Sequence, residues 1–416
     1  MQDQAMASIE AQAPPVIDEA FLEDPYPAYQ AWREEGAMLW SDDFFGGAWL
    51  LTRHADVEAA LRDPALSAQR TGGWVMAAAQ QGRAELRPFQ SLFARAMLFL
   101  DAPDHGRLRQ ILMPAFRPDA LASLQKWLDA TVTERVLALD GSFDFMAQIA
   151  RPLPARVIGR LMDVDPALDT TFMRWCDDIA VFIGAAQPEH AQVLRAQRSL
   201  LEMSAYFEQE LLPWRRQHLG DDLVSRLLQA EAQGQIESSL ELLAQCAMLL
   251  FAGYETTRNL LGNGLHALLS HPSQWRLLCQ QPELAGNAVR ELLRFDSPVQ
   301  WTGRRATRAM TLCGQVIQRG DLILPLIGCA NRDPARHSAP DSLRIDRANP
   351  GALSFGSGAH ICIGAALTQM ETQAVLRALA MHKPGLELNG VPQRNRNPLY
   401  RGWTALPLSD TPHGPH

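Results

Sequence analysis

The chain has 416 residues, 47% of them hydrophobic and 20% charged, and its formal net charge is -8. This composition is typical of a globular protein with ample apolar material for a core. Because the chain is acidic and has no lysine- or arginine-rich stripe, the composition argues against nucleic acid as a partner.

The N-terminus and the cysteines indicate the compartment. The first ten residues are polar and acidic, unlike a signal peptide, and the longest apolar stretch, 246–253, is too short to span a bilayer. Six cysteines are scattered without paired or CxxC spacing. We therefore expect a cytoplasmic protein that does not contact membranes and has no disulfides.

For the first part of the chain, the sequence predicts a loose arm over 1–20, followed by short helices and a strand. A capped helix is expected to start at Asp24, then a strand at 48–52 and a short helix that ends before Pro64. Residues 70–98 carry turn signals and weak periodicity, which locally favour a surface loop.

The next segments are mainly helical. His105 and Arg109 stand four residues apart and share one helical face, where they could hold carboxylates, although a solvated basic helix shows the same pattern. Residues 121–236 read as several amphipathic helices with no domain boundary among them, for example 121–139 and 192–212. The stretch 172–184 has apolar residues on more than one side, so core packing is its default interpretation.

The longest helical pattern runs from Ser238 to Ser270, ~33 residues that would extend about 50 Å. It contains Ala252-Gly-Tyr-Glu-Thr-Thr257, an acid and two hydroxyls in apolar surroundings. A buried carboxylate is costly unless it has a partner or a task, and threonine can open the helix locally. The alternative is a kink with incidental polarity.

Two further patterns follow. Glu291 and Arg294 form an i,i+3 pair, which alone is common on helix surfaces. Leu353-Ser-Phe-Gly-Ser-Gly-Ala-His-Ile-Cys-Ile-Gly-Ala-Ala-Leu367 places Cys362 in a glycine-rich loop before an apolar helix at 363–379. The glycines allow close approach to the backbone, and a helix start favours a thiolate. Most cysteines in such a chain are merely buried.

The pattern Phe355-x-x-Gly358-x-His360-x-Cys362-x-Gly364 resembles the haem-binding loop of the cytochrome P450 superfamily, of the soluble bacterial type. The resemblance covers about residues 21–408. It implies a mainly α fold with a smaller β region, in which a helical bundle with a long distal helix and a small sheet encloses haem b. We therefore expect one domain over 21–408 and a tail over 409–416.

The resemblance also implies roles for individual residues. Cys362 becomes the axial thiolate of the haem iron, and Glu255 and Thr256 become the acid and alcohol that relay protons and steady dioxygen. Tyr254 stands where the family often has histidine. The implied cofactor-binding residues are His105, Arg109, Arg304, Phe355, His360, Ala252, Gly253 and Gly364, with Arg305 as the fallback for Arg304. Glu291, Arg294 and Arg347 form the implied structural ion-pair set, with Leu343 where the family has phenylalanine.

The resemblance also places the substrate pocket in weakly patterned segments. The implied contact residues are Trp74, Val75, Met97, Phe99, Trp175, Val181, Phe182, Val299, Gln300 and Trp301, and the loop 399–403 should return near them. Arg107 and Arg117 are candidates for a basic patch that meets an acidic electron donor.

The implied function is a haem-thiolate monooxygenase that hydroxylates or epoxidises a hydrophobic small molecule in secondary metabolism. The chain shows no flavin or nicotinamide fingerprint, so a ferredoxin and its reductase are the expected donors to a monomeric enzyme. The alternatives are a peroxide-driven peroxygenase and a non-catalytic haem protein for binding or electron transfer. The acid and alcohol at 255 and 256 argue against both.

Overall fold

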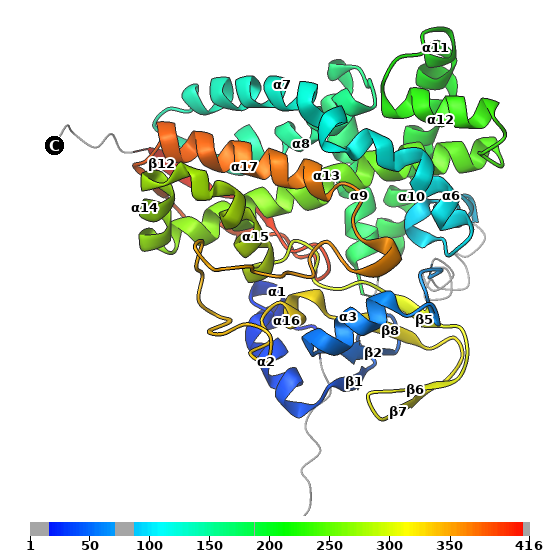
Figure 1. Cartoon of the computed structure of the whole chain (residues 1–416), viewed down its shortest axis with the longest axis horizontal. Helices are drawn as coiled ribbons and strands as arrows, with labels where there is room; N and C mark the ends of the chain where they lie inside the picture. The colour runs from blue at the N-terminus through cyan, green and yellow to red at the C-terminus, as the bar shows by residue number, and fades with distance from the viewer. Residues whose placement is uncertain (1–15, 71–86, 187, 411–416) are drawn as a thin grey trace, which may run out of the picture.

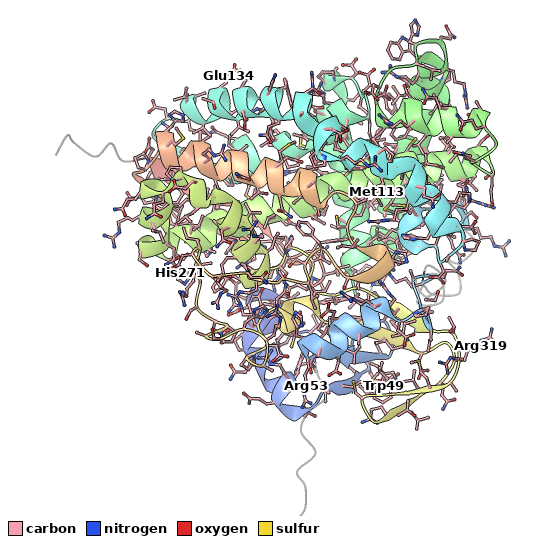
Figure 2. The ribbon with its side chains drawn as sticks, in the orientation of Figure 1. Trp49, Arg53, Met113, Glu134, His271 and Arg319 are labelled. Atoms are coloured by element: carbon pink, nitrogen blue, oxygen red, sulfur yellow. The ribbon has the colours of Figure 1, made fainter. Side chains whose placement is uncertain are left out.

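The computed structural model describes residues 16–70, 87–186 and 188–410. Within them, a large helical body lies above a smaller part that holds the five-stranded sheet with α1, α2, α3 and α16 (Figure 1). Charged side chains such as Arg53, Glu134 and Arg319 lie at the outer edge of the molecule (Figure 2). One hydrophobic core cluster includes residues from Phe21 to Leu408. The fold class expected from the sequence is confirmed.

The five-stranded sheet joins segments that lie far apart in the chain. Its order is β1-β2-β8-β5-β3, with β2 and β8 parallel and the other neighbours antiparallel. Its strands are β1 Met38–Ser41, β2 Ala48–Leu51, β3 Leu66–Ser67, β5 Arg304–Ala306 and β8 Leu322–Pro325. Because β5 pairs with β3, the sheet brings Arg304 close to the residues that follow Ser67.

The remaining strands form three small sheets. The strands β4 Ser142–Asp144, β9 Leu386–Leu388 and β12 Pro407–Asp410 pair in the order β4-β12-β9. Two hairpin-like pairs consist of β6 Met310–Leu312 with β7 Gln315–Ile317, and β10 Gln393–Arg394 with β11 Trp403–Ala405. Since β12 extends to Asp410, residues 409 and 410, expected in a C-terminal tail, belong to a strand.

Helical structure begins earlier in the chain than expected from the sequence. Asp18 caps α1 by accepting a hydrogen bond from Phe21 N, so residues 18–20, expected in a loose arm, belong to a helix and its cap. The helices of this half are α1 Glu19–Glu23, α2 Tyr26–Glu35, α3 His54–Arg62, α5 Arg87–Phe93, η2 Met97–Phe99, α6 Asp104–Leu112, η3 Met113–Phe116, α7 Pro118–Leu137, η4 Met146–Ala150, α8 Pro152–Leu161, η5 Pro166–Leu168, α9 Asp169–Gly184, and α10 His190–Tyr206.

One expected helix continues differently from the prediction. The pattern at 192–212 predicts a single helix, whereas α10 ends at Tyr206 and passes through a π-helical turn, Phe207–Leu211, into α11. Pro213 explains the turn, because proline has no N–H and its ring clashes with the carbonyl four residues earlier. The helices that follow are α11 Leu212–Gln217, α12 Leu223–Ala232, α13 Ser239–Leu269, α14 Pro272–Gln280, η7 Pro282–Leu284, α15 Ala285–Phe295, α16 Ile327–Ala330, η8 Gly358–His360 and α17 Ala365–His382.

The long helix α13 organises the helical body. It has 31 residues, and the side chain of Ser238 caps it by accepting from Glu241 N. It packs against α8, α9, α15 and α17, and it crosses the body in Figure 1. The expected helix at 238–270 is thus confirmed. Among the described helices, none is both long and apolar enough to cross a membrane.

Candidate functional site

A cavity of about 310 Å³ lies between the middle of α13 and the loop before α17. Cys362 lines it from the loop, and Ala252, Gly253, Glu255 and Thr256 line it from α13. The structure therefore brings the predicted sulfur ligand and the predicted acid and alcohol, more than a hundred residues away in the chain, to one space.

The loop that carries Cys362 depends on its glycines. Gly356 and Gly358 have φ angles of 75° and 74°, which favour glycine. A Cβ on Gly358 would also lie 3.0 Å from the carbonyl oxygen of Leu61, so a larger residue would push α3 away. Cys362 N donates to Phe355 O at 2.8 Å, which closes the loop two residues before Gly364, the N-cap of α17.

The thiol of Cys362 has accessible surface, and this surface faces the cavity. The sequence predicts that the nearby helix start favours a thiolate. In the structure burial raises the pKa of the Cys362 thiol, and the Gly364 N–H and the Arg109 charge only partly oppose this effect. Desolvation outweighs the helix start, so a further positive charge at the sulfur is needed to favour the thiolate.

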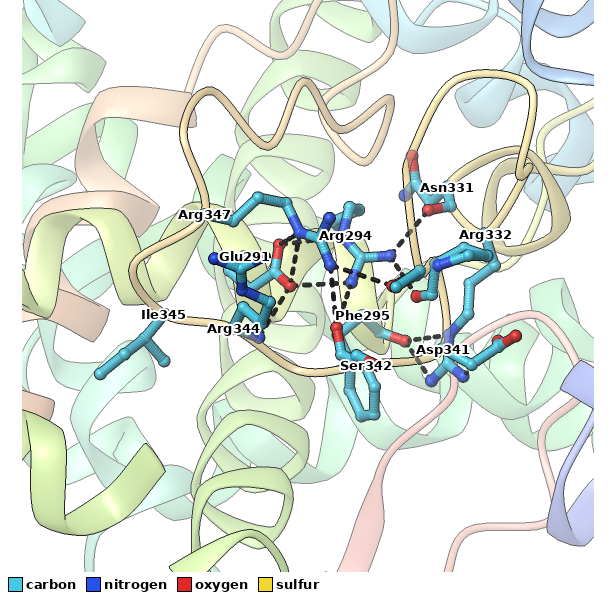
Figure 3. Close-up of polar contacts among 12 residues, drawn as sticks. Glu291, Arg294, Phe295, Asn331, Arg332, Asp341, Ser342, Arg344, Ile345 and Arg347 are labelled. Atoms are coloured by element: carbon cyan, nitrogen blue, oxygen red, sulfur yellow. Dashed lines mark hydrogen bonds and ion pairs between the residues drawn. The ribbon is translucent and has the colours of Figure 1, made fainter. Parts of the chain in front are cut away.

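An ion-pair network holds the segment before this loop (Figure 3). Glu291 and Arg294 are both fully buried, and the Glu291 carboxylate accepts from Arg294 Nε at 2.9 Å and from Arg347 Nε at 3.0 Å. Each arginine also donates to backbone carbonyls of 338–342. The three residues that the sequence predicts as a set thus meet in one network. Leu343 is buried beside it.

Asn331 connects this network to the cysteine loop. Its carbonyl oxygen accepts from Arg294 Nη1 at 3.1 Å, and its side-chain oxygen accepts from Leu353 N at 2.7 Å. Its side-chain nitrogen donates to the hydroxyls of Ser297 and Ser354. Through Asn331, the buried Arg294 of α15 therefore helps to position Leu353 and Ser354, at the start of the loop that carries Cys362.

Four basic side chains lie close together, and two of them, Arg304 and His360, line the cavity. The rings of His105 and His360 lie 4.0 Å apart between centroids, and burial lowers the pKa of both, for His360 to about 3. Arg304 is buried, and it donates to the carbonyl oxygen of Gly303 at 2.8 Å. Burial lowers the pKa of Arg304 to about 10 and also lowers that of Arg109. Within the described ranges, no carboxylate forms a salt bridge with Arg109 or Arg304.

These residues fit a haem group. A buried guanidinium group such as that of Arg304 is costly without a carboxylate partner, and the two propionates of haem would supply the missing charge. Apolar side chains line the space next to the sulfur of Cys362, as a flat cofactor requires.

Glu255 sits at the cavity in a buried polar network. Its Oε1 accepts from Arg258 Nη2 at 2.6 Å and from Asn259 Nδ2 at 3.0 Å, while its buried Oε2 has no partner in the described residues. Arg258 also pairs with Asp177 of α9, which in turn pairs with Arg151. Burial raises the pKa of Glu255, and the Arg258 charge opposes this rise.

The other α13 residues have different surroundings. Thr256 Oγ1 donates to Ala252 O at 3.3 Å, one turn earlier. The sequence predicts that Gly253 leaves room in the cavity, and a Cβ there would also come within 2.8 Å of Ile158, so glycine lets α8 approach α13. Tyr254 is buried under Arg258, and burial raises its pKa to about 12.

The substrate-contact predictions divide into three groups. Phe99, Val299 and Trp301 line the cavity. Trp74 and Val75 lie outside the described residues. The remaining five, Met97, Trp175, Val181, Phe182 and Gln300, do not belong to the described residues that line the cavity.

The orientation of α9 explains why three of the predicted residues do not line the cavity. Val181 is 42% exposed, Phe182 packs on Phe89 with ring centroids 4.9 Å apart, and Trp175 Nε1 donates to Glu202. Ile183 lines the cavity instead. The stretch 172–184 is apolar on more than one side, so its sequence could not indicate which side faces the cavity.

The other differences from the sequence prediction concern single residues. Met97 is replaced at the wall by its neighbour Leu98, and Gln300 turns its amide to Ser297 O at 2.6 Å. Arg107 pairs with Glu241 at 2.8 Å and with Asp104, so its charge is already matched and it does not form a free basic patch. Sequence reasoning missed Arg70 as a lining residue, because it is a lone arginine in an unpatterned segment.

Comparisons with known proteins agree with this geometry. The family model described as Cytochrome P450 matches residues 278–381. Cytochrome P450 107B1 of Saccharopolyspora erythraea is 35% identical over 94% of this chain and 96% of its own length. Polyketide biosynthesis cytochrome P450 PksS of Bacillus subtilis is 35% identical over 87% of this chain and 89% of its own length.

The fold has a solved counterpart of the same size. The crystal structure of CalO2 superimposes with a TM-score of 0.87 at 30% identity, covering 96% of this chain and 100% of the other. The likeness thus includes the sheet, the long helix and the cysteine loop together. The chain belongs to the cytochrome P450 family and is a haem b-dependent monooxygenase.

Proposed function

We propose that Cys362 is the axial ligand of the haem iron and that Glu255 and Thr256 deliver protons during turnover. The observation that carries this proposal is that all three residues line one cavity. Haem b, when bound through a thiolate, supplies the chemistry that activates dioxygen and favours O–O cleavage.

In this proposal Glu255 takes up protons and Thr256 presents a hydroxyl to the cavity. The Oε2 atom of Glu255 has no hydrogen-bond partner in the described residues, so it is available to a water or a hydroxyl. Asp177 is 31% exposed at its side chain and shares Arg258 with Glu255, which gives protons a polar route from the surface. The route ends beside Thr256.

The basic cluster is proposed to bind the haem propionates. His105, His360, Arg109 and Arg304 supply N–H donors, and charge-assisted hydrogen bonds to carboxylates are stronger than neutral ones. The network of Glu291, Arg294 and Arg347 has a structural role, because it positions the loop through Asn331.

We also propose that a ferredoxin and its reductase supply the electrons to a monomeric enzyme, and that the substrate is a hydrophobic molecule of secondary metabolism. Ile361, next to Cys362, is 46% exposed, so a protein partner can reach the outer side of the loop. The relative PksS is named for polyketide biosynthesis, and another solved neighbour holds epothilone D.

The test is the oxidation of a hydrophobic small molecule by the haem-loaded protein. The reaction contains NADPH, a surrogate ferredoxin and ferredoxin reductase under labelled dioxygen. The expected product contains one atom from dioxygen and forms only when both electron-transfer proteins are present. Equal or faster product formation from hydrogen peroxide alone would favour the peroxygenase instead. Tight ligand binding without product under either condition would favour a non-catalytic haem protein.

A further inference from the structure

Arg70 lines the cavity although nothing in its sequence context predicts a site. It follows β3, and its guanidinium lies 4.7 Å from the centre of the Phe99 ring. Nη1 donates to Ala68 O at 3.2 Å. A guanidinium has five N–H donors in a planar fork, so most of the hydrogen-bonding capacity of Arg70 is left for another group.

The charge of Arg70 is not matched by an acid in the described part of the chain. Within residues 16–70, 87–186 and 188–410, no carboxylate forms a salt bridge with it. Burial, with the charge of Arg304 adding to it, lowers the pKa of Arg70 to about 9, so the side chain is still a cation at neutral pH. Glu85 is the one acid in the sequence between 71 and 86, outside the described residues.

The fold makes room for this side chain. A Cβ on Gly303 would lie 2.6 Å from Arg70 Cδ, so a larger residue at 303 would displace the arginine. Gly303 belongs to the segment that enters β5, which pairs with β3 just before Arg70. The glycine and the strand pairing together direct the guanidinium into the cavity.

Arg70 lies between the basic cluster and Tyr400, because its charge lowers the pKa of both His360 and Tyr400. Tyr400 packs on Phe251, the residue before Ala252, with ring centroids 6.0 Å apart. Burial and the charge of Glu255 raise the pKa of Tyr400, whereas the charge of Arg70 lowers it, so Tyr400 lies within reach of both. Tyr400 therefore stands between Arg70 and Glu255, and Arg304 and His360 lie on the other side of Arg70.

We propose that Arg70 binds a carboxylate of the substrate, and that this enzyme therefore acts on apolar carboxylic acids. The inference rests on the proposed function, because it takes the space between α13 and Cys362 as the place of the reaction. The two haem propionates already have four proposed partners, His105, His360, Arg109 and Arg304, and we assign Arg70 to a further anion. Apolar side chains that would contact the carbon chain include Leu98, Ile183, Leu249 and Leu399.

The test is an optical titration of the haem-loaded enzyme at pH 7.5 with decanoic, dodecanoic and tetradecanoic acids and the primary alcohols of equal length. At least one acid is expected to bind about tenfold more tightly than its alcohol, the size of one charge-assisted hydrogen bond. Arg70→Gln should remove this preference while changing alcohol affinity less than about twofold. Arg70→Lys should keep part of the preference.

Two controls separate Arg70 from other charges. Arg95→Gln removes an exposed cation four residues before Phe99 and should leave the preference for acids intact. If Arg95→Gln also removed the preference for acids, a general effect of positive charge would explain it and the proposal would be overturned. Glu85→Gln should change acid affinity less than about twofold. A tenfold gain in acid affinity for Glu85→Gln would show that the Glu85 carboxylate pairs with Arg70 in the parent enzyme, which would also overturn the proposal.

The carbon monoxide spectrum and the haem dissociation rate of each variant are measured on the same samples. Loss of the thiolate spectrum in the parent enzyme would mean that the proposed function fails, which is distinct from a missing acid preference. Faster haem loss in Arg70→Gln with an unchanged acid preference would assign Arg70 to a propionate and overturn the proposal. No preference at any chain length in the parent enzyme would overturn it too.

Discussion

Arg258 donates to Glu255 Oε1 at 2.6 Å from one turn further along α13, and the pair is almost completely buried. The acid at the cavity is therefore not an isolated carboxyl. Arg258 holds one carboxylate oxygen and leaves the other without a partner in the described residues, and it links the acid to Asp177 on α9. Arg258 thus contributes both to the setting of the proton-delivery acid and to the packing of α9 on α13.

Arg258→Gln should destabilise the protein by about 3 kcal/mol, because removing one partner leaves a buried carboxylate without its cation. Glu255→Gln in the same chain should restore most of that loss. The free energy of unfolding in urea measures both effects. Arg174→Gln is the control, since it breaks the more exposed pair with Glu202 and should cost less than about 1 kcal/mol. Equal losses for the two arginine variants would contradict a special role of the buried pair.

Thr256→Ala should lower the amount of product per NADPH severalfold while NADPH is still consumed, because the hydroxyl at the cavity is lost. Thr257→Ala is the matched control. Thr257 is buried and its hydroxyl lies 3.2 Å from that of Thr368, so its loss should leave the product yield nearly unchanged. The measurement is the ratio of product to NADPH consumed. A yield that falls equally in both variants would count against the role of Thr256.

The protein should lose stability below pH 6.5 through His337. Burial, followed by the charge of Arg294, lowers the pKa of His337 to about 3, from an ordinary value of 6.5. Between pH 6.5 and pH 3 the unfolded chain therefore binds a proton at His337 that the folded chain does not bind. The stability present above pH 6.5 is lost as the pH falls toward 3. Between pH 7 and pH 5 this amounts to about 2 kcal/mol.

Urea unfolding at several pH values measures this effect as the difference between parent and variant. His337→Gln should be less sensitive to pH over this range, whereas His382→Gln, which removes an exposed histidine, should follow the parent. Parallel curves for parent and His337→Gln would show that His337 is not the titrating group.

Gly184→Ala should destabilise the protein by about 1–3 kcal/mol, because the new Cβ would overlap the side-chain amide of Asn397. That amide joins α9 to the late loop by donating to Ala180 O and accepting from Leu399 N and Tyr400 N. Gly286→Ala has ordinary contacts and should gain about 0.5 kcal/mol. Urea unfolding that shows the same sign for both variants would contradict the close contact.

Regular patterns and specific motifs could be predicted from the sequence. The helix at 238–270 has a long, uninterrupted apolar period, and the structure places it within one residue of the prediction at each end. The motif residues around Cys362 and the acid-alcohol pair line a common cavity. The helix depends on near neighbours in the chain, which a single sequence records, whereas the shared site is implied by the resemblance to a family motif.

The substrate wall could not be predicted in the same way. Val181, Phe182 and Ile183 are all apolar, and only the packing of α9 on its neighbours decides that Ile183 faces the cavity. Arg70 enters the cavity because β3 pairs with β5 and Gly303 leaves space, and both causes lie more than 200 positions away. Contacts of this range leave no periodic signal.

The carbon monoxide difference spectrum of the dithionite-reduced protein tests the central claim most directly, with Cys362→Ser and the control Cys279→Ser beside it. Cys279 is half-buried and is not among the described residues at the cavity. We expect the red-shifted Soret maximum of a haem-thiolate in the parent and in Cys279→Ser, and its loss in Cys362→Ser. A histidine-like maximum in the parent, or a thiolate spectrum that survives Cys362→Ser, would contradict the assignment.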